Sequence, residues 1–268
     1  MTSRAAASIG AAILVALIFA AIFAPAMAPY NPAEQNLEND LAASSRNHLL
    51  GTDKLGRDLL SRILYGSRVS LMVGTTTVTI SVLIGLLVGA LSGYFRGWVD
   101  QLLMRLVDVL MAFPGILLAI AFTAVLGPGL DHVVLALSLI GWTGYARLVR
   151  GEILALREKE FVHAALALGA PPARVIGLHM LPNLLPSLLI QATFGMAAAI
   201  IAEGGLSFLG LGAQPPTPSW GSMLNEGRQF ILVAPHLTAF PGLAIMATVL
   251  GLNLVGDGLR DKLEKRGE

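Results

Sequence analysis

Residues 157–182 read REKEFVHAALALGAPPARVIGLHMLP, a polar and small-residue stretch between two strongly apolar runs. Residues 158–168 are strong helix formers with acidic residues in the first turn, and Gly169 stands where a C-terminal helix cap belongs. Pro171 and Pro172 cannot continue that helix, but proline suits the first turn of another one. The stretch therefore predicts a short helix, a glycine break and a second helix that leads into the next apolar run.

The composition around this stretch is typical of a membrane protein. Only 13% of the 268 residues are charged and 55% are hydrophobic, whereas a soluble domain has about a quarter charged residues. Lipid rather than water would solvate such a surface, so the bilayer is the first expected partner. The net charge of +1 and the lack of a dense basic block argue against nucleic acid. With no cysteine and no HExxH pattern among its five histidines, the sequence predicts no metal site.

Six apolar runs are long enough to cross a bilayer, for which a helix needs about 20 residues. The fourth run ends in two arginines that can reach the headgroups. The Pro- and Gly-rich stretch 204–225 is instead expected to be an ordered loop at one membrane face. The predicted spans are residues 9–28, 69–94, 102–126, 132–150, 184–204 and 233–256.

Basic residues set the orientation of these spans. With the N-terminus inside, twelve of the 18 basic residues lie on inner segments, as the positive-inside rule requires. Both termini and the stretch 157–182 are then cytoplasmic. The exception is the outer segment 29–68, which carries five basic and five acidic residues.

The topology divides the chain into three units. Residues 1–68 form a first transmembrane helix with a periplasmic segment, residues 69–260 a core of five transmembrane helices, and residues 261–268 a short cytoplasmic tail. The sequence Ala26-Met-Ala28 resembles a signal-peptidase site, so a cleaved first helix is the alternative. The length of the run, about 20 residues, favours a retained span.

The stretch 157–182 resembles the signature of bacterial ABC importer permeases, E-A-A-x3-G-x9-I-x-L-P. The corresponding positions here are His163, Ala164, Ala165, Gly169, His179, Leu181 and Pro182. Five of the seven match the signature. The other two differ, because His163 replaces the usual glutamate and His179 the usual isoleucine. The role of that glutamate therefore does not transfer, and Glu160 is its alternative.

The resemblance implies a type I ABC importer permease fold, which is an all-α integral membrane protein with six transmembrane helices. In this family the loop between spans four and five forms a cytoplasmic coupling helix that docks on an ATPase subunit. The implied partners are a second permease of the same family, two ATPase subunits and an extracytoplasmic substrate-binding protein, in the bacterial or archaeal cytoplasmic membrane. The residues expected to couple to the ATPase are Glu160, Phe161, His163, Ala164, Ala165, Gly169, Leu181 and Pro182.

Three further matches narrow the resemblance to the peptide and nickel branch, of the dipeptide/oligopeptide permease C type. The first is GTDKLGRDLLSR at 51–62, followed by GSRVSL at 66–71. The others are LSFLGLG at 206–212 with PPTPSWG at 215–221, and NLVGD at 253–257. The branch leaves the cargo open among dipeptides, oligopeptides, nickel chelates and glutathione-like compounds.

The chain has no GxxxxGK[ST] motif to cradle ATP phosphates. ATP and Mg²⁺ are therefore expected on separate ATPase subunits, and this chain is expected to hold no cofactor and to catalyse no reaction itself. Movement of residues 158–170 as a rigid lever would tilt the fourth and fifth spans and switch the path between inward and outward openings.

Charged residues within spans are the candidate gate or pathway groups. Glu203, at the outer end of the fifth span, is expected either at headgroup depth or lining an outer gate. Arg105 and Asp108 have i,i+3 spacing near the inner end of the third span and are expected to pair with each other. A secondary transporter is the rival class, but it leaves the stretch 157–182 unexplained. An intramembrane enzyme would need a nucleophile or a metal site, and the sequence shows neither.

Overall fold

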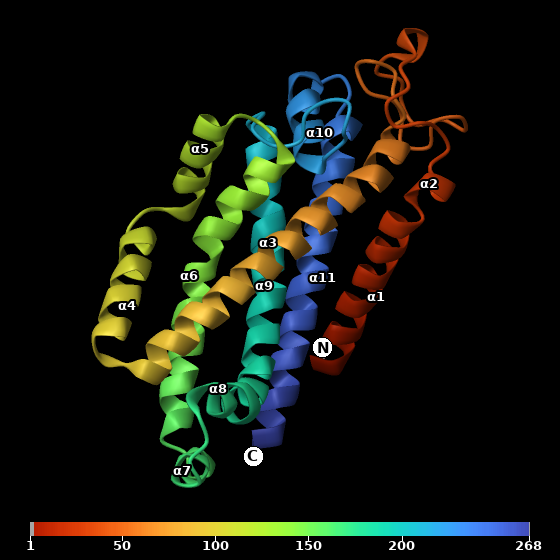
Figure 1. Ribbon diagram of the computed structural model, residues 1–268. Helices are drawn as coiled ribbons and strands as arrows, with labels where there is room; N and C mark the ends of the chain where they lie inside the picture. Colours follow the sequence, from red (N-terminus) through yellow and green to blue (C-terminus); the bar gives the residue numbers. More distant parts are fainter. Residues whose placement is uncertain (1–2, 268) are drawn as a thin grey trace.

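Helices dominate residues 3–267, the part of the chain described by this computed structural model (Figure 1). The one strand-type pairing within that range is an isolated bridge between Thr52 and Asp58. The prediction of an all-α protein is confirmed. Five long helices form the bundle: α1 (Ser3–Ile22), α3 (Leu59–Phe95), α6 (Leu130–Arg157), α9 (Leu181–Phe208) and α11 (His236–Gly267).

Shorter helical elements connect and cap the long ones. Single 3₁₀ turns cover Leu37–Asn39 and Arg228–Phe230, and a π-helical segment, Val175–Met180, leads into α9. The short α-helices are α2 (Ala24–Met27), α4 (Gly97–Met111), α5 (Gly115–Leu126), α7 (Glu160–Ala167), α8 (Pro172–Arg174) and α10 (Trp220–Gly227).

The third predicted span is broken. Within residues 3–267, five helices are long and apolar enough to cross a membrane, and α4 with α5 makes a sixth if the pair is one span. A continuous helix over 102–126 is therefore a wrong prediction, because α4 and α5 meet at an angle of 84°. The chain turns at 112–114, where Pro114 has no N–H to donate and disfavours helical geometry in the residue before it.

Several helices extend beyond the charge-free runs that predicted them. The helix α3 begins at Leu59 rather than at 69, and its 37 residues measure about 55 Å. The hydrocarbon core of a bilayer is about 30 Å thick, so part of α3 projects outside it. The predicted loop 204–225 is also partly wrong, because α9 runs to Phe208 and α10 follows. A capping box between Ser219 and Ser222 starts α10, a signal that the surrounding prolines obscured.

Glycines bring α3 and α6 close together. A Cβ added at Gly85 would lie 2.4 Å from the Cβ of Tyr145, and one at Gly89 would lie 2.5 Å from the carbonyl oxygen of Ala146. Small residues at such spacing let the backbones of membrane helices approach closely. The two helices are therefore in close contact along this stretch.

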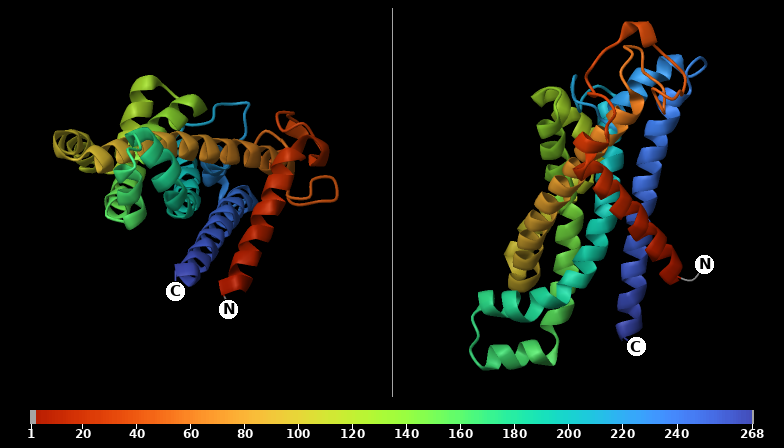
Figure 2. Two further views of the ribbon diagram at one scale, coloured as in Figure 1. Left: turned by 60° about the horizontal axis from the view of Figure 1, so that its bottom comes forward. Right: turned by 90° about the vertical axis from the view of Figure 1, so that its right-hand side faces the viewer.

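The two ends of the bundle differ in structure. Helices α7 and α8 project at one end, and both termini lie toward that end, whereas α10 and the loop after α2 lie at the other (Figure 1). A second view shows α7 and the segment 172–180 one above the other beyond the ends of α3 and α4 (Figure 2, right). The stretch 157–182 is thus presented at an end of the molecule, on the same side as the termini.

Candidate functional site

One face of α7 holds this helix to the bundle. Val162 and Ala165 are buried in an apolar cluster that also contains Val175 and Met180. Because Val162 and Ala165 are three residues apart, they lie on the same side of the helix. The predicted helix over 158–168 is confirmed, with α7 at Glu160–Ala167.

Apolar side chains are exposed on and just after α7. Phe161 is 42% exposed, Leu166 37% and Leu168 88%. Apolar patches with a polar rim are typical of surfaces that bind another protein. Since α7 lies at the projecting end of the molecule (Figure 2), these side chains are accessible to a partner.

The helix α7 ends in a Schellman motif, which fixes the direction in which the chain leaves the helix. The N–H of Gly169 donates to the carbonyl of Leu166 at 2.9 Å, and the N–H of Ala170 donates to that of Ala165 at 3.1 Å. Gly169 has a φ of +78°, where a residue with a Cβ is strained. The predicted glycine cap is confirmed. Nothing lies within 4 Å of a Cβ added at Gly169, so a substitution there would meet backbone strain and no clash.

The predicted coupling residues do not share one surface. Glu160, His163 and Ala164 are exposed on α7, whereas Ala165 packs inward. Leu181 and Pro182 form the first turn of α9. Some positions of the signature are therefore exposed, others pack against the bundle, and the last two begin a helix. The exposed Leu166 and Leu168 were not predicted, and the register does not indicate Leu166, because it lies one turn after the buried Val162.

The end of α6 that leads into α7 is tied to the corner between α3 and α4. Arg157 donates to the backbone carbonyl of Tyr94, and its guanidinium carbon lies 5.5 Å from the centre of that ring. Arg96 donates to Glu158 at 2.7 Å, and this hydrogen bond lowers the pKa of Glu158 below its ordinary value. Sequence reasoning missed these contacts because the partners are 63 and 62 residues apart.

Two ion pairs join α4 to α6. Arg150 donates twice to Asp100, at 2.5 and 2.6 Å. Arg147 donates to Asp108 at 2.6 Å. The prediction that Asp108 pairs with Arg105 is therefore wrong. The i,i+3 neighbour was the partner visible in the sequence, but the fold brings α6 alongside.

A cavity of about 280 Å³ lies between α3, α5, α6 and α9. Several of its lining residues are glycine or alanine, which leave this space open, and no charged residue is among those that line it. The hydroxyl of Thr77 is buried and has no partner among the described residues. The cavity thus offers neutral hydrogen-bonding groups within the spanning helices. Its polar lining residues are Thr77, Ser81, Tyr145 and Gln191.

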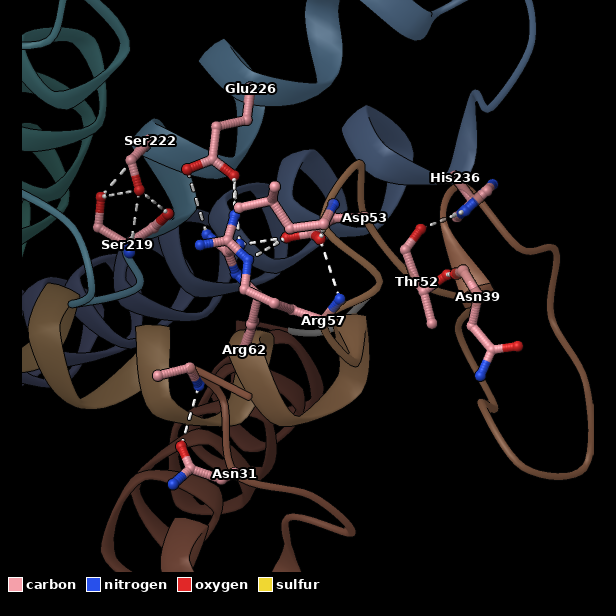
Figure 3. Close-up of polar contacts among 12 residues, drawn as sticks. Asn31, Asn39, Thr52, Asp53, Arg57, Arg62, Ser219, Ser222, Glu226 and His236 are labelled. Atoms are coloured by element: carbon pink, nitrogen blue, oxygen red, sulfur yellow. Dashed lines mark hydrogen bonds and ion pairs between the residues drawn. The ribbon is translucent and has the colours of Figure 1, made fainter. Parts of the chain in front are cut away.

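At the opposite end, segment 29–68 meets α10 in a buried ionic cluster (Figure 3). Asp53 accepts hydrogen bonds from Arg57, at 2.6 Å, and from Arg62. Glu226 of α10 accepts from Arg57 at 2.5 Å and lies 3.2 Å from a guanidinium nitrogen of Arg62. We call these four residues the outer cluster. Two of the basic residues that departed from the positive-inside pattern are therefore neutralised within the fold.

Glu203 lies deep between helices near the same end. It is 1% exposed, so the side chain is enclosed by the protein. Its carboxylate accepts from Ser207 at 2.7 Å and lies 3.5 Å from the hydroxyl of Ser70. Through these contacts Glu203 links α9 to α3. It is not among the residues that line the cavity.

Comparison with known proteins places this geometry in a family. Residues 81–267 match the family described as binding-protein-dependent transport system inner membrane component. The chain belongs to this family. Residues 3–44 match a second family, described as the N-terminal transmembrane domain of oligopeptide transport permease C. The chain is thus a multi-pass permease subunit of an ABC importer, as the signature implied.

Individual relatives agree with this assignment. The dipeptide transport system permease protein DppC of Alkalihalophilus pseudofirmus is 46% identical over 234 residues, 87% of this chain and 77% of the relative. The glutathione transport system permease protein GsiD of Escherichia coli is 50% identical over 222 residues, 83% of this chain and 73% of the relative. An inward-facing structure of the MetNI methionine ABC transporter superposes with a TM-score of 0.62 at 18% identity, covering 77% of this chain and 96% of that one. The predicted type I importer permease fold is confirmed.

Proposed function

We propose that this permease forms one half of a transmembrane path for small peptides and that α7 is its contact with a separate ATPase subunit. The observation that carries the proposal is the exposed apolar surface of α7, held at the projecting end by a buried face and a glycine cap. In the proposed complex α7 and both termini face the cytoplasm. A second permease of the family, two ATPase subunits with ATP and Mg²⁺, and an extracytoplasmic substrate-binding protein complete the importer. The chain itself then holds no cofactor and catalyses no reaction.

Dipeptides, oligopeptides and glutathione-like peptides are the proposed cargo. The named relatives, which are dipeptide and glutathione permeases, favour peptides over nickel chelates. The neutral cavity supports the same choice, because hydroxyl and amide groups can bond the amides and carbonyls of a peptide backbone. A lining without charge would admit peptides of different side-chain charge and leave selection to the binding protein.

The outer end is proposed as the closed side of this half-path. The outer cluster joins α10 to α3 through Glu226 and Arg62, and Glu203 joins α9 to α3. Segment 29–68 would brace this end rather than enter the path. The extracytoplasmic binding protein would dock on this side.

The test uses the assembled importer in proteoliposomes, with uptake of a radiolabelled dipeptide and ATP hydrolysis measured in parallel. Phe161→Glu places a charge on the exposed surface of α7, so the affinity for the ATPase subunit should fall roughly tenfold or more, as for an aromatic anchor in an interface. The matched control is Leu37→Glu, which adds the same charge at an exposed site (68%) at the opposite end. Uptake should fall with Phe161→Glu, and the affinity for the ATPase subunit should stay unchanged with Leu37→Glu. Dipeptide uptake by vesicles that lack the ATPase subunits would contradict the proposal and favour a secondary transporter.

A further inference from the structure

The helix α4 is joined to α6 by one small apolar cluster and by two ion pairs. Within α4, Val107 is the one buried residue, and it lies in a cluster with Trp142 and Ala146 of α6, against which two partly buried apolar side chains of α4 also pack. Asp100 and Asp108 of α4 form ion pairs with α6. The ion pairs therefore add directional polar contacts to a small apolar one.

The Asp100–Arg150 pair is the firmer of these links. Its two hydrogen bonds fix both the distance and the orientation of the groups, as a bidentate guanidinium–carboxylate pair does. The side chains are 17% and 34% exposed, against 58% and 48% for Asp108 and Arg147. Ser92 of α3 also donates to Asp100. Asp100 thus joins three helices at one point.

Arg150 stands about two turns before the end of α6, where the chain continues into α7. On the other side of the link, α4 leads through the bend at 112–114 into α5. Gly115 and Ile116 of α5 line the cavity. A continuous set of contacts therefore runs from α7 to one wall of the cavity.

We propose that the Asp100–Arg150 pair is a transmission link that passes movement of α6 to the broken span α4–α5 and so repositions the α5 wall of the cavity. The inference rests on the proposed function, since it takes α7 as the part that the ATPase moves. Asp100 and Arg150 are positioning residues in this scheme, because neither lines the cavity. The 84° bend allows α5 to turn when α4 is displaced.

The first test is Asp100→Asn, which keeps the shape of the side chain and removes its charge. Assembly with the ATPase subunits and ATP hydrolysis should persist, while dipeptide uptake should fall on the order of tenfold, the size of a typical coupling between sites. The control is Glu158→Gln, which likewise removes the charge from a carboxylate paired with an arginine, Arg96. The Glu158 side chain is 63% exposed beyond the end of α6, so its pair is screened by water and uptake should stay within about threefold of the parent. Parent-level uptake by Asp100→Asn, or a matching loss of assembly, would overturn the proposal.

A second test replaces the ion pair by a covalent bridge. The chain has no cysteine, so Asp100→Cys with Arg150→Cys creates one defined pair. Uptake should be low while both thiols are reduced and should rise severalfold when a short bifunctional thiol reagent joins them. Low uptake after bridging would overturn the link, because a mechanical connection should not depend on charge. The reagent should not change uptake by the parent protein.

These results separate the link from the proposed function. If Phe161→Glu abolishes uptake and Asp100→Asn does not, the link fails while the role of α7 stands. If vesicles without ATPase subunits take up the dipeptide, the proposed function fails whatever the link does.

Discussion

The two ends of this permease use ion pairs in different surroundings. In the outer cluster the side chains of Asp53 and Arg57 are each 6% exposed and that of Arg62 is 2% exposed. At the end that carries α7, the side chains of Arg96 and Glu158 are 43% and 63% exposed. The same chemistry therefore joins helices with little water at one end and in contact with water at the other.

Burial decides how easily such pairs can rearrange. Removing one partner from a buried pair leaves an uncompensated charge, which is strongly destabilising. An exposed pair exchanges its partner for water at little cost. We infer that the outer ends of α3 and α10 move as one rigid block, whereas the contacts around α7 can change when an ATPase subunit moves.

The largest loss of folding stability is expected from Asp53→Ala, which leaves Arg57 and Arg62 without their most buried partner. The loss of a partner from a buried ion pair costs about 3–5 kcal/mol, so thermal unfolding in detergent should occur at a clearly lower temperature. Glu34→Ala is the matched control, because Glu34 is an exposed acid on the same outer segment. Equal unfolding temperatures for Asp53→Ala and the parent would remove the difference between the two ends.

A smaller and local effect is expected from Gly169→Ala. The φ of +78° at Gly169 costs a residue with a Cβ roughly 1–2 kcal/mol. Amide hydrogen exchange should accelerate in α7 while the outer ends of α3 and α10 keep their protection, and dipeptide uptake should fall. Gly177→Ala is the control, because Gly177 has no positive φ and an added Cβ meets nothing within 4 Å. Identical exchange in the two variants would contradict the role of the cap.

Much of this design could be predicted from local sequence. Gly169 has a positive φ because it ends a helix. A glycine directly after a run of helix formers is enough to predict this. The apolar runs revealed where spans lie, because bilayer thickness sets their length. The boundaries were less accurate, since α3 also includes Arg62, whose charge is neutralised by Asp53 and by the distant Glu226.

Long-range pairing is what the sequence did not reveal. Glu226 binds Arg57 from 169 positions away, and Arg150 binds Asp100 from 50 positions away. Local spacing instead favoured Arg105 as the partner of Asp108. A partner choice of this kind depends on which helices pack together, so it follows from the fold and not from spacing.

The smallest effect on folding stability is expected when the exposed ion pair Arg96–Glu158 is broken. Arg96 lowers the pKa of Glu158, so the pair favours the folded state above the ordinary pKa of glutamate and loses this contribution as the pH falls through the lowered value. Arg96→Gln should raise the pKa of Glu158 toward its ordinary value and leave the unfolding temperature nearly unchanged. Carbon-13 NMR titration of the Glu158 carboxyl group checks this. An unshifted titration midpoint would show that Arg96 is not its partner in solution.

The most direct measurement compares two spin-label distances in the assembled importer, with and without trapped ATP. One pair, at Ala173 and Leu232, reports on the α7 end relative to the outer end, and the other, at Lys54 and Arg228, reports within the outer end. Binding of ATP should shift the first distance distribution and leave the second in place. A fixed first distance, or equal shifts in both, would contradict a mobile cytoplasmic lever on a rigid outer block.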